Sequence, residues 1–440
     1  MTLAVESARQ RIAAQKARLP VMYASVDFDH QPERFTDDPQ HAVARDRTPF
    51  GVAVTADDLE LVRAYTMLGD EVGDAYAALI PQYGFRNLVG MLVTACEKGI
   101  EAVDDAPAEL VAFIRAMEAT PDWVDMDMVR EGMRADRLST ALVAPFAIRG
   151  AFIATFLNKY SALPMALTGT LSNETAAKRV NETATFFATT VLPGALERHG
   201  EGFKAAAMVR LMHSMVRFNA LRSGRWDSKV YGVPIPQVDQ MPAGLIPIFL
   251  LSFKMMAEGR TTFTRTERAK VELARYRCFL LGLPEDLLAD TPEGIVRAMT
   301  ARNTTLRQGF DDETCGALVR ATLAAYLPTR ETPGAKLHNA LEKRFAKVLF
   351  LRQFLKGDRA AARRMGVEIS GLDTAVFAGI ALWIALQSAF YRLASRLPGL
   401  REAADAALVG RVRKLLGMYG HAEFVSDASR YRPAATRAAA

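Results

Sequence analysis

Apolar residues recur at three- and four-residue spacing along most of the chain, and this period constrains the fold more than any other feature. The pattern is clearest in residues 59–67, 110–117, 204–221 and 268–281, which we predict to be amphipathic helices. Few stretches alternate with a period of two, and no Asn-Gly or Asp-Gly turn joins two of them. We therefore predict an all-α fold.

Helix-start signals support this prediction. Thr264 and Glu267 have the spacing of a capping box ahead of a helical stretch. Thr291 precedes Pro292, which places a capping residue before a proline at the first helical position. Both features predict where a helix begins.

The chain of 440 residues is 50% hydrophobic and 24% charged, which excludes a disordered protein. We predict one large helical domain over residues 49–425, with its core in about residues 130–393. An irregular N-terminal arm (residues 1–48) would lie on this body, and a mobile tail (residues 426–440) would follow it. Residues 224–247 are rich in Pro and Gly and form the longest predicted interior loop, a candidate functional segment.

Charge and cysteine content exclude several classes of function. The net charge is 55 − 49 = +6, too small to indicate a nucleic-acid partner. The three cysteines are far apart and no Cys-x-x-Cys occurs, so structural zinc, thioredoxin-type and covalent c-type haem sites lack their signal. Residues 1–18 contain no apolar core of a secretory signal. We expect a cytoplasmic protein, with peripheral membrane association left open.

One apolar segment raises the question of a membrane span. Between Asp373 and Arg392 lie 18 uncharged residues, slightly fewer than the roughly 20 that span a bilayer. We predict a buried core helix and no stable span. A membrane helix is the alternative.

Common catalytic motifs are absent from the sequence. No Glu-x-x-His, His-Glu-x-x-His, Gly-x-Ser-x-Gly, Walker A or Gly-x-Gly-x-x-Gly pattern occurs. These absences argue against a helical di-iron site, a zinc protease, an α/β-hydrolase, a P-loop protein and a Rossmann protein.

His213 lies within an apolar stretch that we predict to be helical. Arg210 and Arg217 lie three residues before it and four after it, so all three share one helical face. Two guanidiniums disfavour protonation of the imidazole, and a neutral imidazole is the form that binds metal. Arginine also pairs well with carboxylates. The pattern suits a haem bound through His213, although a hydrogen-bonded core histidine beside two surface arginines would have the same spacing.

A second polar cluster lies upstream. Arg179, Glu182 and Thr183 share one face at the start of an otherwise apolar helix. An exposed Arg–Glu pair that fixes a helix start is the alternative interpretation.

These residues belong to a wider set of motifs. The set comprises Arg179-x-x-Glu182-Thr183, residues 209–217 (Val-Arg-Leu-Met-His-Ser-Met-Val-Arg), Trp226, residues 232–237 (Gly-Val-Pro-Ile-Pro-Gln), residues 121–125 (Pro-Asp-Trp-Val-Asp) and residues 141–150 (Ala-Leu-Val-Ala-Pro-Phe-Ala-Ile-Arg-Gly). Together they resemble the haem b oxygenase family of the bacterial latex-clearing proteins (rubber oxygenases) and the fungal ER-bound oxygenase of mycophenolic acid biosynthesis. The resemblance covers residues 59–393.

The resemblance implies a globin-like helical core that holds one non-covalent haem b. The proximal histidine of the family corresponds to His213, and the flanking arginines to Arg210 and Arg217. Its distal arginine and threonine correspond to Arg179 and Thr183. We expect Arg217 and Arg210 to pair with the haem propionates, with Arg344 as a further candidate, because arginine forks match carboxylates.

The sequence departs from the family at one distal position. Glu182 stands where the latex-clearing proteins carry lysine, and no upstream match for their distal-pocket glutamate is evident. The leading hypothesis is a haem b-dependent oxygenase that acts with dioxygen on a small apolar substrate, such as an isoprenoid or unsaturated lipid. A non-catalytic haem or gas-sensing protein and a cofactor-free helical lipid-binding protein are the alternatives.

Overall fold

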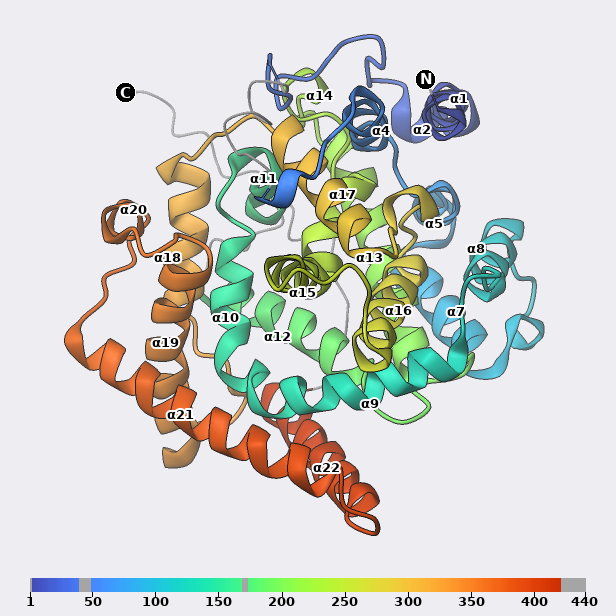
Figure 1. Cartoon of the computed structure of the whole chain (residues 1–440). Helices are drawn as coiled ribbons and strands as arrows, with labels where there is room; N and C mark the ends of the chain where they lie inside the picture. Colours follow the sequence, from blue (N-terminus) through green and yellow to red (C-terminus); the bar gives the residue numbers. More distant parts are fainter. Residues whose placement is uncertain (1, 39–48, 168–172, 421–440) are drawn as a thin grey trace.

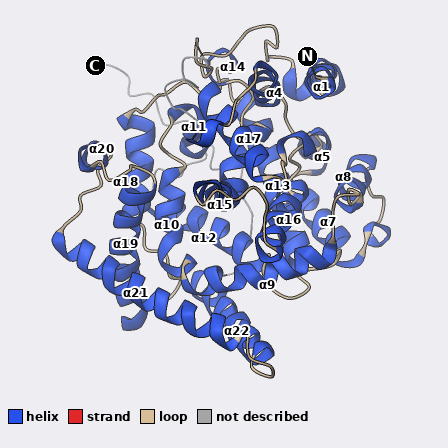
Figure 2. Ribbon diagram, viewed as in Figure 1, coloured by secondary structure: helices blue, strands red, loops and turns tan. Residues whose placement is uncertain are grey.

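The computed structural model describes residues 2–38, 49–167 and 173–420 of the chain. Within these ranges the elements are helices, and the one β-type contact is an isolated antiparallel bridge between Phe35 and Leu306 (Figure 2). The predicted all-α fold is confirmed.

The longer elements follow one another through short connections. In chain order they are α1 (Leu3–Arg18), α2 (Pro20–Tyr23), α4 (Ala56–Thr66), α5 (Glu71–Ala77), α6 (Ile80–Tyr83), α7 (Phe85–Lys98), α8 (Ala108–Glu118), α9 (Met126–Leu142), α10 (Ala144–Ala154), α11 (Lys159–Leu167), α12 (Asn173–Thr189), α13 (Glu201–Arg222), α14 (Ser228–Tyr231), α15 (Gln237–Ala257), α16 (Arg265–Leu280), α17 (Pro292–Thr305), α18 (Ala317–Ala324), α19 (Pro333–Gln353), α20 (Arg359–Arg364), α21 (Gly371–Ala394) and α22 (Arg401–Tyr419).

Helices α12, α13, α15 and α16 occupy the middle of the molecule (Figure 1). Helix α15 packs on α16 and α17, α16 packs on α9, and α10 packs on α19. Helices α21 and α22 form the lower edge of the view, where α21 lies along α19 and α22 lies against α9.

The four helices predicted from periodicity are present as α4, α8, α13 and α16. Both predicted helix starts are also confirmed. The Thr264 side chain accepts a hydrogen bond from the Glu267 backbone, and the Glu267 side chain accepts one from the Thr264 backbone. Thr291 caps α17 ahead of Pro292.

The first residues of the chain are more ordered than we predicted. The expected irregular arm is wrong for Leu3–Arg18, which forms α1 and packs on α4. Val5 and Ala8 are fully buried, so a narrow apolar stripe holds this polar helix to the body. Residues 39–48 of the predicted arm and the predicted tail, residues 426–440, lie outside the described residues.

The predicted interior loop is shorter than residues 224–247. Helix α15 begins at Gln237 and continues through Pro242 and Pro247. Val238, Met241, Leu245 and Ile248 are buried along one side of it, so packing outweighs the missing backbone donors of the two prolines. The remaining loop includes Gly232 and Ile235, which both adopt a positive φ.

The prediction of a buried core helix after Asp373 is wrong. These residues form α21, whose neighbours cover one side of it and leave the other in solvent. Two helices of the described residues, α15 and α21, are long and apolar enough to cross a membrane. Of their apolar windows, 33% is buried in α15 but only 6% in α21.

The three cysteines lie in the interior as free thiols. Cys96 and Cys278 belong to the largest apolar cluster, and Cys315 belongs to a second cluster around α10, α12 and α18. Burial raises the pKa of Cys96 and of Cys278 to about 12 and that of Cys315 to about 11. The thiols therefore stay protonated and unreactive at neutral pH.

Candidate functional site

His213 lies near the middle of α13, where most neighbouring side chains of the same helix are buried. Its own side chain is half-buried. The Nδ1 atom lies 3.2 Å from Oε1 of Gln240 on α15. This contact orients the ring between two central helices.

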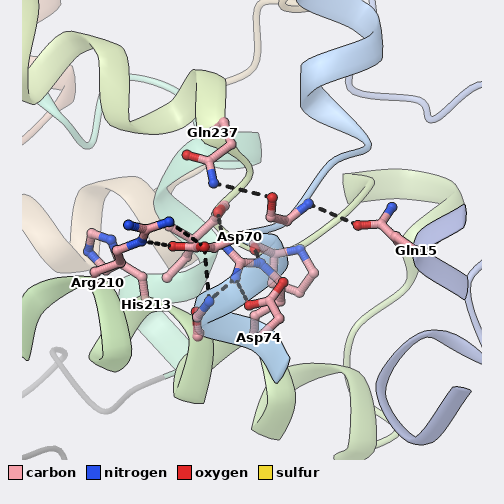
Figure 3. Close-up of polar contacts among 12 residues, drawn as sticks. Gln15, Asp70, Asp74, Arg210, His213 and Gln237 are labelled. Atoms are coloured by element: carbon pink, nitrogen blue, oxygen red, sulfur yellow. Dashed lines mark hydrogen bonds and ion pairs between the residues drawn. The ribbon is translucent and has the colours of Figure 1, made fainter. Parts of the chain in front are cut away.

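A chain of amide groups fixes which ring nitrogen carries the proton. Gln237 Nε2 donates to the backbone carbonyl of Gly69 at 3.2 Å (Figure 3). Gln240 Nε2 in turn donates to Gln237 Oε1 at 3.0 Å. A backbone carbonyl can only accept, so Gln237 and then Gln240 must present their oxygens in this order. Gln240 Oε1 therefore accepts from His213 Nδ1–H, and the lone pair is on Nε2.

The ring is neutral at neutral pH. Burial, together with the nearby charge of Arg217, lowers the pKa of His213 to about 4. Within the described part of the chain, no residue hydrogen-bonds Nε2. A neutral imidazole with Nδ1–H donated to a protein acceptor and Nε2 free is the arrangement found in histidines that bind a metal.

The backbone at Gly69 anchors this chain of amides. Gln15 Oε1 accepts from the Gly69 backbone at 3.1 Å, and Gln15 Nε2 donates to the Met67 carbonyl at 2.7 Å. A Cβ at position 69 would lie 2.0 Å from Oη of Tyr23 and 2.2 Å from Oδ2 of Asp74. A larger residue at position 69 would therefore displace the side chains of Tyr23 on α2 and Asp74 on α5.

Arg210 is bound by Asp70, the residue that caps α5. The guanidinium contacts both carboxylate oxygens, with Nη2 at 2.9 Å from Oδ1, and Asp70 also accepts from the Gly73 backbone at 3.0 Å. Burial alone would raise the pKa of Asp70, but the Arg210 guanidinium holds it below its ordinary value. Asp70 therefore stays ionised inside the fold.

Arg217 is fully buried and bound by Asp74. Its Nε donates to the Pro234 carbonyl at 2.9 Å and its Nη2 to the Ile235 carbonyl at 2.6 Å. Asp74 also accepts from Tyr23 Oη at 2.5 Å. Arg217 thus ties α13 to α5 and to the loop before α15, whose positive φ at Ile235 aims both carbonyls at it.

Arg344 lies in a different part of the molecule. Its Nη1 donates to Asp373 at 2.8 Å, and Lys347 lies 3.6 Å from the same carboxylate. These contacts join α19 to the start of α21. The structure does not bring Arg344 into the network around His213.

The predicted upstream cluster lies on α12, next to α13. Arg179 Nη1 is 2.8 Å from Glu182 Oε2 and 3.1 Å from the sulfur of Met212, the residue before His213. Glu182 is buried, and its Oε1 has no hydrogen-bond partner among the described residues, although Lys178 Nζ is 3.9 Å away. Thr183 is half-buried on the same helix. The predicted Arg–Glu pair is therefore present, and Arg179 points toward the histidine helix.

Sequence reasoning missed the partners of the predicted residues. Gln240 and Gln237 are three residues apart, and Asp70 and Asp74 are four apart, so each pair shares a helical face. Asp70 and Asp74 lie on the side that faces Arg210 and Arg217 of α13, and each carboxylate pairs with one of these arginines. Only tertiary structure shows which faces meet.

A solvent-open cavity of about 730 Å³ lies beside α15. Its lining comes from α10, α11, α15, α17, the segment after α17 and the end of α19, and includes Ile246, Phe249, Met299 and Phe310. None of the predicted site residues lines it, but Asp239, next to Gln240 in the chain, does. The volume lies within the roughly 300–1,000 Å³ typical of small-molecule sites.

Comparison with known families decides how the site is classified. Residues 103–386, more than half of the chain, match the model of the ER-bound oxygenase mpaB/B′/rubber oxygenase catalytic domain. The chain belongs to this family.

A solved structure of the latex clearing protein LCP in the closed state has the same fold as this family member. The TM-score is 0.54 at 17% identity, and the match covers 86% of this chain and 95% of LCP. No curated protein sequence matches the chain. The family indicates an oxidoreductase of the oxygenase type, and the structural likeness confirms the fold.

Proposed function

We propose that this protein is a haem b-dependent oxygenase that acts with dioxygen on a small apolar substrate, such as an isoprenoid or an unsaturated lipid. One observation supports the proposal most directly. The amide chain from Gly69 through Gln237 and Gln240 orients His213 and leaves its Nε2 free, while burial keeps the ring neutral. These are the properties that an axial haem ligand needs.

The donor set is consistent with a haem rather than a metal held by protein ligands alone. Among the described residues, no group of three or more His, Cys, Asp or Glu side chains is placed to hold a metal ion. His213 would be the side chain that holds the haem, because the macrocycle would supply the remaining nitrogen ligands. Bound haem would supply the dioxygen chemistry, and the protein would supply binding, orientation and electrostatics.

We further propose that Arg179, Glu182 and Thr183 line the face opposite His213. The contact of Arg179 with Met212 and the unpartnered Oε1 of Glu182 support this. Glu182 is a carboxylate where rubber oxygenases carry lysine, so it does not offer a nitrogen ligand to the iron. Arg179 would pair with Glu182, and the Thr183 hydroxyl would donate a hydrogen bond into the pocket.

The propionate contacts of Arg210, Arg217 and Arg344 stay predictions. Each guanidinium already pairs with an aspartate in the structure. A propionate would have to share the guanidinium with that aspartate. The lining of the cavity beside α15 is mixed, and its apolar side chains such as Ile246, Phe249 and Met299 support an apolar substrate. The cytoplasmic location also stays a prediction.

The first experiment compares His213→Ala with His338→Ala. His338 is a matched control because it is also half-buried, and burial also lowers its pKa. His213→Ala should lose the Soret band or bind haem much more weakly, whereas His338→Ala should retain it. Full haem occupancy with an unchanged Soret band in His213→Ala would refute the assignment.

Three further measurements test the haem attachment, the activity and the distal residues. Acidified organic solvent should extract the haem, because no Cys-x-x-Cys-His motif exists to bind it covalently. Oxygen consumption with candidate alkenes distinguishes an oxygenase from a non-catalytic haem protein. If Glu182→Gln and Thr183→Ala both leave the ligand-binding spectrum unchanged, the distal assignment fails.

A further inference from the structure

Helix α21 exposes an apolar face along its whole length. Leu382, Leu386, Phe390 and Leu393 are 62%, 63%, 63% and 60% exposed and recur at the spacing of one helical stripe. Trp383 is 41% exposed beside them. Helices on the surface of a soluble protein usually direct polar side chains outward. Here the outward face has no charged residue between Asp373 and Arg392.

The inward face holds α21 lengthwise against the body. At its start, Asp373 accepts from Arg344, and the Phe377 ring stacks on Phe345 with centroids 4.7 Å apart. Toward its end, Arg411 of α22 donates to Gln387 and lies over the ring of Tyr391. Helix α21 therefore runs along the lower edge of the molecule (Figure 1) and does not project from it.

The chain on both sides of α21 is rich in positive charge. Residues 351–420 contain 11 basic and 5 acidic side chains, a net charge of +6, which equals the net charge of the entire chain, 55 − 49 = +6. Exposed cations precede α21 at Lys356, Arg359, Arg363 and Arg364. Others follow its apolar face at Arg392, Arg396 and Arg401. Among the described residues, none of these seven cations forms a salt bridge.

We propose that the α21 face docks on an anionic lipid bilayer, with the helix lying in the interface and not crossing it. An amphipathic helix of this kind buries its apolar face at the boundary of headgroups and acyl chains while flanking arginines contact anionic headgroups. The tryptophan ring suits the same depth. At 24 residues, the helix would lie along roughly 36 Å of membrane surface.

Charge favours a membrane over a second copy of the chain. A symmetric dimer through α21 would set the same cationic region of each copy against its equivalent, and like charges disfavour such an interface. An anionic lipid surface supplies the opposite sign. The proposal is independent of the haem, and it would place the protein where apolar molecules dissolve.

The test is flotation of the full chain with vesicles of phosphatidylcholine and phosphatidylglycerol (about 70:30). The wild-type protein should float with these vesicles in 0.1 M salt. It should float far less with pure phosphatidylcholine or in 0.5 M salt, because salt screens the arginines. Alkaline carbonate should release it. Failure to float with anionic vesicles, or retention in carbonate as an integral protein, would overturn the proposal.

Two sets of variants locate the binding surface. Leu386→Glu/Phe390→Glu should lower vesicle affinity by about tenfold or more, because charge is costly in the apolar layer. Arg392→Gln/Arg396→Gln/Arg401→Gln should weaken binding to anionic vesicles by a similar factor. Leu3→Glu/Val21→Glu is the matched control, since these residues are 88% and 50% exposed. They belong to α1 and α2, which lie at the opposite edge of the molecule from α21 (Figure 1).

The control should float as the wild-type protein does. Circular dichroism and the unfolding temperature establish that each variant is folded, and the arginine variant still tests the proposal if the glutamate variant does not fold. Wild-type flotation by both α21 variants would overturn it. So would a glutamate variant that converts a dimer to a monomer while flotation is unchanged, because the face would then join two copies.

Discussion

Two regions of this molecule differ in whether their arginines are buried and paired or exposed and unpaired. Between α5 and α13, Arg210 and Arg217 are buried and each is bound by an aspartate. Around α21, exposed arginines such as Arg396 have no carboxylate partner among the described residues. A charge inside a protein requires a partner, whereas a charge at the surface can be left for a ligand. The first region is therefore built for rigidity, and the second is open to binding.

The largest effect should come from breaking a buried pair. Arg217→Met leaves Asp74 ionisable and unpaired in the interior, so the free energy of unfolding should fall by about 3–5 kcal/mol. Arg396→Gln removes an exposed charge and should change it by less than about 0.5 kcal/mol. Urea unfolding of both variants measures the difference.

A double variant distinguishes charge from packing. Asp74→Leu combined with Arg217→Met removes both charges, so the double variant should regain part of the free energy of unfolding that Arg217→Met alone loses. If Arg217→Met and Arg396→Gln lowered the free energy of unfolding equally, the difference between buried, paired arginines and exposed, unpaired ones would be wrong.

A smaller effect should follow from changing Gln240, and it depends on the proposed haem. Gln240→Leu removes the acceptor of His213 Nδ1–H, so haem affinity should fall by about 10–100-fold. Haem titration followed at the Soret band measures it. Gln240→Glu keeps an acceptor oxygen for His213 but removes the donor to Gln237 Oε1, so it separates the role of the acceptor from that of the amide chain. Equal affinities for the leucine variant and the wild-type protein would mean that Gln240 does not orient the ring.

An effect comparable to that of Gln240→Leu should be a dependence of stability on pH. His213 has an ordinary pKa of 6.5 in the unfolded chain and about 4 in the folded apoprotein, because burial and Arg217 disfavour its protonation. Between these values the unfolded state binds more protons, so stability falls as the pH is lowered. Urea unfolding at pH 7 and pH 4.5 should show a smaller loss for His213→Gln than for the wild-type protein. If both proteins lost the same free energy of unfolding between pH 7 and pH 4.5, the lowered pKa of His213 would be contradicted.

Local signals predicted much of this fold, and tertiary pairing limited the rest. The period of α13 and the cap at Thr264 depend on neighbouring residues, so the sequence shows them directly. Helix α21 was predicted to be buried because its apolar sequence does not distinguish a helix covered by protein from one exposed to another apolar phase. Helix α15 was partly mistaken for a loop because Pro242 and Pro247 are local signals, while the packing that outweighs them is not.

The site shows the same limit. His213 and Arg217 could be chosen from one stretch of sequence, because an arginine within an apolar helix is unusual. Their partners Asp74 and Gln240 lie on other helices, and Asp74 is 143 residues away from Arg217. No spacing rule connects such residues. The sequence therefore predicted the arginine as a haem contact, whereas the structure shows an aspartate bound to it.

The buried cysteines make the chain a convenient subject for site-directed labelling. All three thiols are inaccessible and held in the protonated form, so a maleimide should react slowly with the native protein. A cysteine introduced at an exposed position, such as Leu386→Cys, would react first without removal of the natural three. A polarity-sensitive fluorophore attached there would report directly on the surroundings of α21.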